Sequence, residues 1–156
     1  MRISLLLFFV VLTSCKLHIN NHDWEYVKNE VRQTLDDYAS DIRTGGLMTE
    51  FKYLDSSEQF FWVPPGYTNA LSYDSVRAII TKNAGNFKLV DNRWDTLRII
   101  PLSEELANYT GVLQSDMTLQ NDTVMHYRMI ETGIMIKRQS GWKLLSGQTA
   151  VLPPKQ

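Results

Sequence analysis

The sequence contains a single cysteine, Cys15, so no disulfide bond can form within the chain. It also lacks an excess of positive charge, because 16 lysine and arginine residues face 17 aspartate and glutamate residues. Nucleic-acid binding depends on concentrated positive charge, so this balance argues against nucleic acid as a partner. A Gly-x-Ser-x-Gly elbow, a glycine-rich phosphate loop and a Cys/His cluster with zinc spacing are absent as well. We therefore expect neither a metal nor a cofactor.

The length and the hydrophobic content of the chain predict one compact domain. A chain of 156 residues, of which 44% are hydrophobic, is long enough to bury a core. The chain is rich in aromatic side chains, with 4 tryptophans and 7 tyrosines. This richness is typical of a deep core or of a lined cavity.

The N-terminal segment has the pattern of an export signal. Arg2 precedes an apolar run over residues 3–12, which suits a signal peptide but falls short of the roughly 20 residues that span a bilayer. The run ends in Leu12-Thr13-Ser14-Cys15, and these four residues resemble the lipobox of bacterial lipoproteins. The resemblance implies removal of residues 1–14 as a signal peptide and attachment of lipid to Cys15. A plain secretory signal followed by an unrelated cysteine is the alternative.

Residues 15–23 are expected to form a lipidated, polar tether in front of a domain over residues 24–156. His18 and His22 lie four residues apart, so on a helix they could bind a metal, but a solvated linker is the preferred interpretation. The residue after the cysteine is Lys16 rather than aspartate. By resemblance to the sorting rule of Gram-negative lipoproteins, this residue implies the outer membrane, facing the periplasm. The expected partner of this segment is therefore a membrane.

Two periodicities organise the rest of the chain. Apolar residues recur at helical spacing from Trp24 to Ile42, and Gly45-Gly46 ends the pattern. A short helix is expected at residues 48–54, and a third runs from its cap Ser72 to about Ala84. Strands are expected at 59–63, 93–102, 106–119, 124–138 and 142–151. Short turns between the long strands predict an antiparallel meander, so the fold class is α+β, with helices packed on a curved, mostly antiparallel sheet.

This order of elements resembles the nuclear-transport-factor-2-like cone fold, which includes SnoaL-like proteins and ketosteroid isomerases. The segments that carry the resemblance are Asp37-Tyr38 through Gly45-Gly46, the strand-turn-helix from Phe61 to Ile80, and the hairpin from Ile134 to Leu145. In that family a long helix and a concave sheet enclose a cavity, and many members are homodimers. The resemblance therefore implies a cavity and a homodimer.

The resemblance to ketosteroid isomerases extends to individual residues. Tyr38 lies where those enzymes have a tyrosine that donates a hydrogen bond to the substrate oxyanion. Val63 lies at the position of the general base and cannot accept a proton, so steroid isomerase activity is not expected. Near the position of the second oxyanion donor, only Glu131 is acidic.

Alternation along residues 124–138 predicts which side chains face the cavity. Glu131 falls on one face with Tyr127, Met129 and Met135, and the other face carries Ile130, Thr132 and Ile134. The isoleucine face is interpreted as concave. The methionine face is then exposed, and we expect it to be the surface through which the homodimer forms.

The candidate ligand-binding residues are Tyr38, Trp62, Tyr67, Tyr109, Arg128, Thr132 and Gln148. Aromatic side chains with a few polar groups are the usual lining of a small-molecule site. Arg128 could meet a carboxylate or phosphate, and Gln148 lies where many SnoaL-like relatives carry a histidine. Core packing of the aromatic residues and a surface ion pair at Arg128 are the alternatives.

Three functional hypotheses follow. The first is a membrane-anchored domain that binds a small hydrophobic ligand or has an accessory role, without catalysis. The second is a SnoaL-like enzyme of isomerase, cyclase or hydrolase type, with Tyr38 as hydrogen-bond donor and His126 or Glu131 as acid–base group. The third is a structural subunit whose cavity is filled by its own side chains. A titratable side chain in the cavity within reach of Tyr38 would favour the enzyme.

Overall fold

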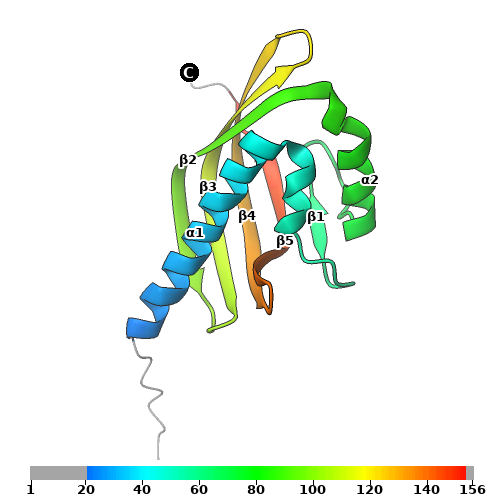
Figure 1. Ribbon diagram of the computed structural model, residues 1–156. Helices are drawn as coiled ribbons and strands as arrows, with labels where there is room; N and C mark the ends of the chain where they lie inside the picture. The colour runs from blue at the N-terminus through cyan, green and yellow to red at the C-terminus, as the bar shows by residue number, and fades with distance from the viewer. Residues whose placement is uncertain (1–20, 154–156) are drawn as a thin grey trace, which may run out of the picture.

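The computed structural model describes residues 21–153, and the predicted signal peptide, Cys15 and His18 lie outside this part of the chain. The elements are α1 (Asn21–Gly45), η1 (Leu47–Lys52), β1 (Phe61–Val63), α2 (Tyr73–Asn83), η2 (Ala84–Asn86), β2 (Phe87–Pro101), β3 (Leu106–Leu119), β4 (Val124–Arg138) and β5 (Gly141–Val151) (Figure 1). Within residues 21–153 no helix is both long and apolar enough to cross a membrane.

Helix α1 forms because its apolar residues make one stripe, which packs against the sheet. Val27, Val31, Leu35 and Ile42 are all buried. The helix ends as expected at the glycine pair, where the Gly46 amide donates to the Ile42 carbonyl at 2.8 Å and Gly46 adopts a φ of 79°. It begins at Asn21, so the end of the segment expected to be a tether belongs to the helix.

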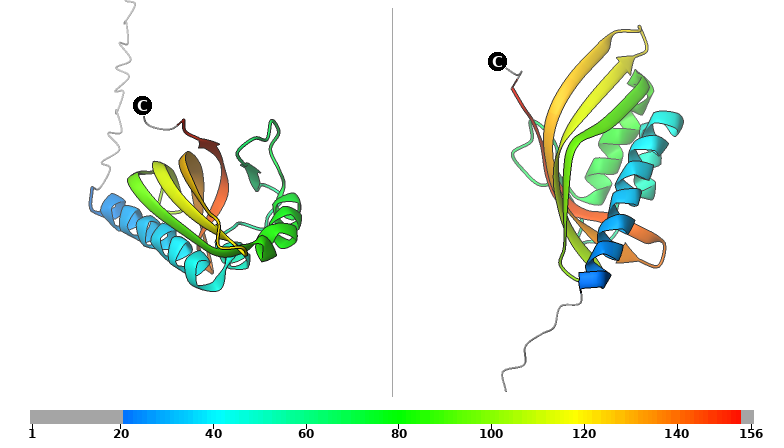
Figure 2. Two further views of the ribbon diagram at one scale, coloured as in Figure 1. Left: turned by 90° about the horizontal axis from the view of Figure 1, so that it is seen from above. Right: turned by 90° about the vertical axis from the view of Figure 1, so that its left-hand side faces the viewer.

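The five strands form one sheet in the order β1-β5-β4-β3-β2. Strands β2 to β5 are an antiparallel meander, and the short β1 pairs with β5 in parallel. Register shifts at Trp94/Thr96 and Ile134/Met135 mark irregularities of the kind that bend a sheet. Figure 2 shows the curved sheet with α1 and α2 on the same side. The predicted α+β class, with helices on a curved and mostly antiparallel sheet, is confirmed.

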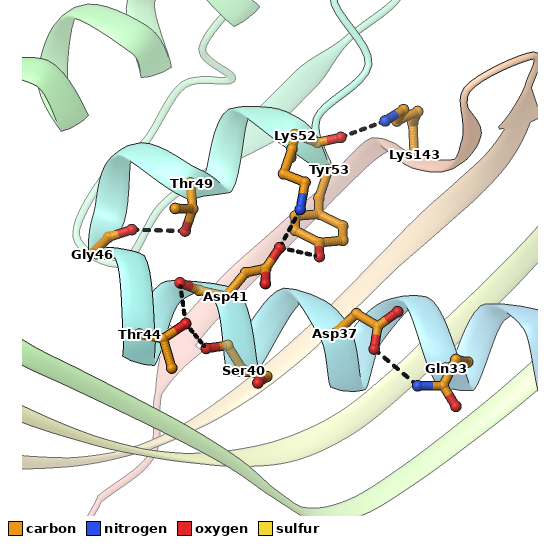
Figure 3. Close-up of polar contacts among 10 residues, drawn as sticks. All are labelled: Gln33, Asp37, Ser40, Asp41, Thr44, Gly46, Thr49, Lys52, Tyr53 and Lys143. Carbon is orange, nitrogen blue, oxygen red and sulfur yellow. Dashed lines mark hydrogen bonds and ion pairs between the residues drawn. The ribbon is translucent and has the colours of Figure 1, made fainter.

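The segment that follows α1 is tied back onto that helix (Figure 3). The Asp41 carboxylate of α1 accepts hydrogen bonds from Lys52 Nζ at 2.5 Å and from the Tyr53 hydroxyl at 2.7 Å. Lys143 of β5 donates to the Lys52 carbonyl, so the sheet holds the same end of η1. The short helix expected at residues 48–54 is present as this 3-10 helix over Leu47–Lys52. Its position matters because it carries Glu50.

An ion pair between a buried carboxylate and an exposed arginine joins the loop after η1 to the last hairpin. The Asp55 carboxylate, whose side chain is 4% exposed, accepts from Arg138 Nε at 2.5 Å and from the Ser57 amide at 2.9 Å. Burial raises the pKa of Asp55, but the bonds from Arg138 and Ser57 outweigh it, so the pKa lies below its usual value.

Replacing Asp55 by alanine should therefore lower the unfolding free energy by about 1–3 kcal/mol at pH 7, because Arg138 loses a charge-assisted partner. The folded-state pKa of Asp55 is lowered, so its contribution is present above the ordinary aspartate pKa and is lost as the pH falls through the folded value. Urea denaturation at pH 7 and at a series of lower pH values would measure this, and the difference between the variant and wild type should shrink as the pH falls below the ordinary aspartate pKa. Glu25→Ala, at an exposed ion pair with Lys28 on α1, is the control and should change little. Equal losses in the two variants would contradict the prediction.

Candidate functional site

A cavity of about 230 Å³ lies between α1, η1 and the concave face of the sheet. An apolar cavity of about 150 Å³ can hold benzene, so this one has room for a ring with a few substituents. Most of its wall is apolar and aromatic, including Leu35, Phe60, Trp62, Trp94, Tyr109 and Met135. The third hypothesis, a cavity filled by its own side chains, is not what the structure shows.

Two glycines allow aromatic rings to lie directly on the sheet. A Cβ atom on Gly147 would lie 2.3 Å from the Trp62 ring and 2.3 Å from the Thr132 carbonyl oxygen. A Cβ atom on Gly133 would lie 2.8 Å from the Tyr109 ring. The absence of side chains at these positions makes space for two of the aromatic walls.

The first titratable group in the wall is Glu50, which η1 presents to the cavity beside Tyr38 of α1. The Tyr38 hydroxyl donates to Glu50 Oε1 at 2.9 Å, and the Tyr38 ring is held edge-on by Tyr53 at 5.4 Å between centroids. Burial raises the pKa of Glu50 to about 7, with a smaller upward contribution from the charge of Glu131, whereas the bond from Tyr38 lowers it. Burial also raises the pKa of Tyr38 well above its usual value, so its hydroxyl stays protonated and continues to donate.

The second titratable group is Glu131 of β4. It accepts from the Tyr109 hydroxyl at 2.8 Å through one oxygen and from the Thr149 hydroxyl at 3.1 Å through the other. Burial raises its pKa, and these two bonds offset part of that rise. Since Glu131 has two donors and Glu50 has one, Glu131 is the better stabilised carboxylate of the two. Both residues are half-buried, and both line the cavity.

Three further polar atoms in the wall accept or donate no hydrogen bond within residues 21–153. They are Asn92 Oδ1, Trp94 Nε1 and Ser115 Oγ. Among the described residues that line the cavity, none is a lysine, arginine or histidine. The site therefore combines two carboxyl groups, two tyrosine hydroxyls and a set of neutral polar atoms in an apolar enclosure.

The structure brings three of the predicted ligand residues together, because Tyr38, Trp62 and Tyr109 all line this cavity. Tyr67 and Gln148 lie instead in a separate depression beside the ends of β1 and β5. Ligand binding by any of the five stays a prediction.

Two other predicted ligand residues lie away from the cavity. Arg128 donates from Nε to Asp95 at 3.4 Å, which is the surface ion pair considered as the alternative. The Thr132 hydroxyl donates to the Tyr109 carbonyl at 3.0 Å. His126, the candidate acid–base group, is 73% exposed and lies 2.7 Å from Asp116, so it does not reach the cavity.

The prediction of the concave face of β4 was wrong. Met129, Glu131 and Met135 line the cavity, whereas Ile130 is 43% exposed on the other face. Branched residues favour strands on either face, so a run of isoleucines did not identify the interior. The methionine face therefore cannot be the dimer surface that was expected, because Met129 and Met135 are buried.

Sequence reasoning missed Glu50, Asn92 and Ser115. A signal for Glu50 exists, since it lies at helical spacing between Leu47 and Leu54, which also line the cavity, and a carboxyl group is unusual among apolar residues at that spacing. Asn92 and Ser115 interrupt alternating apolar positions of β2 and β3.

No family model and no curated protein sequence matches this chain. Its fold is nevertheless similar to several solved structures. A provisionally named scytalone dehydratase from Novosphingobium aromaticivorans matches with a TM-score of 0.75 and 10% identity, covering 86% of this chain and 89% of that one. A nuclear transport factor 2-like superfamily protein from Salmonella enterica matches with a TM-score of 0.67 and 14% identity, covering 85% of this chain and 95% of that one. A hexachlorocyclohexane dehydrochlorinase from Novosphingobium barchaimii matches with a TM-score of 0.67 and 10% identity, covering 86% of this chain and 92% of that one. These likenesses confirm the expected fold.

Proposed function

Because the chain has the nuclear-transport-factor-2-like cone fold, we propose that its cavity is the active site of an enzyme that moves a proton on a small, largely apolar substrate. The observation that carries the proposal is a pair of carboxyl groups in one cavity, each hydrogen-bonded to a tyrosine hydroxyl. A titratable side chain within reach of Tyr38 was the feature expected to favour an enzyme, and Glu50 is such a side chain.

Glu50 has the properties of a general base. An acid–base group works best when its pKa lies close to the working pH, and burial brings that of Glu50 to about 7. In the proposed step, the Glu50 carboxylate takes a proton from the carbon next to a substrate carbonyl. The C–H electron pair forms a C=C bond, and the carbonyl oxygen takes the negative charge. Return of the proton to the same or a neighbouring carbon completes an exchange or an isomerisation.

Tyr38 and Glu131 position and tune that base. The Tyr38 hydroxyl fixes one oxygen of Glu50 and leaves the other carboxylate oxygen for the substrate proton. The charge of Glu131 raises the pKa of Glu50, and Tyr109 and Thr149 hold Glu131 in place. Elimination begins with the same proton removal, and two similar structures carry names of elimination enzymes, a dehydratase and a dehydrochlorinase.

A non-catalytic ligand-binding or accessory domain is the second candidate, and the largely apolar lining of the cavity favours it. For either function we propose that the domain is anchored by lipid on Cys15 in the bacterial envelope, in the outer membrane facing the periplasm. A homodimer is also proposed, through a surface other than the methionine face.

Proton exchange with solvent tests the enzyme proposal. Full-length protein in detergent would be incubated in D₂O with neutral ketones and hydroxy-ketones, beginning with hydroxymethyl phenyl ketone. Proton NMR would follow the signal of the hydrogens next to the carbonyl. We expect the signal to decay faster with wild-type protein than with an equal amount of the Glu50→Gln variant. Equal decay with both proteins for every compound would overturn the proposal in favour of binding alone.

A further inference from the structure

The concave face of β2 and β3 carries a group of polar atoms that have no role in the proton transfer as described so far. We call Asn92, Trp94 and Ser115 the β2–β3 trio. Their Oδ1, Nε1 and Oγ atoms are buried without a hydrogen-bond partner within residues 21–153, and the Ser115 side chain is fully buried. Buried polar atoms almost always have partners, so three in one cavity wall indicate a ligand that supplies them.

The register of the sheet places these residues together. Asn92 of β2 pairs directly with Ser115 of β3, and both line the cavity. Side chains directly opposite each other on antiparallel strands have Cβ atoms about 4.5–5.5 Å apart, so one small functional group can reach both. Trp94 follows two residues along β2, and its ring packs edge-on against Tyr109 at 6.0 Å between centroids. Asn92 and Ser115 therefore form one polar patch, and the Trp94 ring lies against Tyr109, which donates to Glu131.

The atoms of the trio define what they can recognise. The indole N–H of Trp94 can only donate, Oδ1 of Asn92 can only accept, and the Ser115 hydroxyl can do both. A ligand that satisfies all three presents an acceptor oxygen next to a hydroxyl. A carbonyl with a neighbouring hydroxyl has this arrangement.

The charge of the cavity restricts the ligand further. Glu50 and Glu131 are both in the wall, and no lining residue in the described part of the chain is basic. A carboxylate or phosphate ligand would face two carboxyl groups without a counter-charge, which is unfavourable in an enclosed apolar site. The ligand that fits is neutral.

We propose that the β2–β3 trio binds the carbonyl oxygen and an adjacent hydroxyl of a neutral hydroxy-ketone, with Trp94 and Ser115 donating to the carbonyl and Asn92 accepting from the hydroxyl. This inference rests on the proposed proton-transfer function, for which it names the substrate class. The two donors would meet the negative charge that develops on the carbonyl oxygen when Glu50 removes the neighbouring proton.

Three related compounds test the recognition by isothermal titration calorimetry on full-length protein in detergent. Hydroxymethyl phenyl ketone has both groups, methyl phenyl ketone lacks the hydroxyl, and mandelate replaces the ketone by a carboxylate. We expect the first to bind about five- to tenfold more tightly than the second, the value of one hydrogen bond, and mandelate not to bind. Binding of mandelate as tight as that of the hydroxy-ketone, or no binding of the hydroxy-ketone, would overturn the proposal.

Matched variants separate recognition from folding. Ser115→Ala and Trp94→Phe should each weaken binding of hydroxymethyl phenyl ketone about five- to tenfold. Without ligand, Ser115→Ala should melt at the wild-type temperature or above it, because it removes an unpartnered hydroxyl. Ser57→Ala is the control: its hydroxyl is also buried and unpartnered among residues 21–153, but it does not line the cavity, so binding should not change. Wild-type affinity in both trio variants would contradict the inference.

The binding and exchange experiments can contradict the trio inference and the enzyme proposal separately. Glu50→Gln should retain the affinity for hydroxymethyl phenyl ketone within about twofold, since the trio is intact. If the trio variants weaken binding while no compound shows proton exchange, the trio's role in ligand binding is supported and the enzyme proposal is wrong. If exchange occurs but the trio variants bind hydroxymethyl phenyl ketone with wild-type affinity, the enzyme proposal is supported and the trio inference is wrong.

Discussion

Replacing Glu50 by glutamine should slow protein-dependent proton exchange by about a hundred- to ten-thousandfold, the usual contribution of one general base. Glutamine has nearly the same shape and can still accept the hydrogen bond of Tyr38, but it cannot take a proton from carbon. The rate of signal loss in D₂O at pH 7 measures the effect. Glu58→Gln, at an exposed acidic residue on the loop before β1, is the control and should behave as wild type.

The pH dependence of the rate identifies the base. Because Glu50 acts in its ionised form, the rate should rise with pH and level off above an apparent pKa of about 7. The hydrogen bond from Tyr38 lowers this pKa, so Tyr38→Phe should move the midpoint to higher pH. The charge of Glu131 raises it, so Glu131→Gln should move the midpoint to lower pH. Midpoints that stay together in all three proteins would exclude Glu50 as the titrating base.

Stability should respond to Glu50 as well. Its pKa is raised by folding, so the folded chain holds this proton more tightly than the unfolded chain. The unfolding free energy should then decrease as the pH rises from the ordinary glutamate value through about 7. Glu50→Gln removes this loss and should be more stable than wild type at pH 8, with the difference disappearing near pH 4. A variant less stable than wild type at pH 8 would instead indicate that Glu50 has a structural role.

Replacing Cys15 by alanine should abolish incorporation of labelled fatty acid and leave the signal peptide uncut or the protein released from the membrane. The reason is chemical, because the thiol is the attachment point and no other cysteine exists in the chain. Metabolic labelling followed by membrane fractionation measures both effects. Lys16→Asp is the matched variant, and by the sorting rule it should keep the lipid but accumulate in the inner membrane. Continued labelling of the alanine variant would show that the lipobox resemblance is misleading.

The sequence predicted the elements well where local chemistry determines them. Ser72 caps α2 by accepting from the Ser75 amide, as expected of a serine before an apolar helix. The ends of β3 and β4 fall at the expected residues because turn residues flank them. Strand β2 begins at Phe87 rather than at Arg93, since its first residues mix apolar and polar side chains and are held by pairing with β3, for instance between Asp91 and Asp116. Pairing between residues distant in the chain produces no pattern in the local sequence that could have predicted this part of the strand.

The candidate site was predicted only in part, for a related reason. Tyr38 could be placed because the helical stripe of α1 has one buried side. A strand has two faces of similar composition, and only the position of the helices decides which face is enclosed. Glu131 was therefore assigned to the wrong face of β4, and Glu50 was not considered because its role depends on where η1 lies against α1.

The bonds that join Asp41 to Lys52 and Tyr53 have a consequence for the proposed proton transfer. They fix the end of η1 to the same helix that carries Tyr38, one turn away from that residue. The distance between Glu50 and Tyr38 is then set by the backbone of two connected elements and does not depend on an occupant of the cavity. A base that is already oriented needs little reorganisation when charge moves, and such preorganisation is a major source of rate enhancement in enzymes.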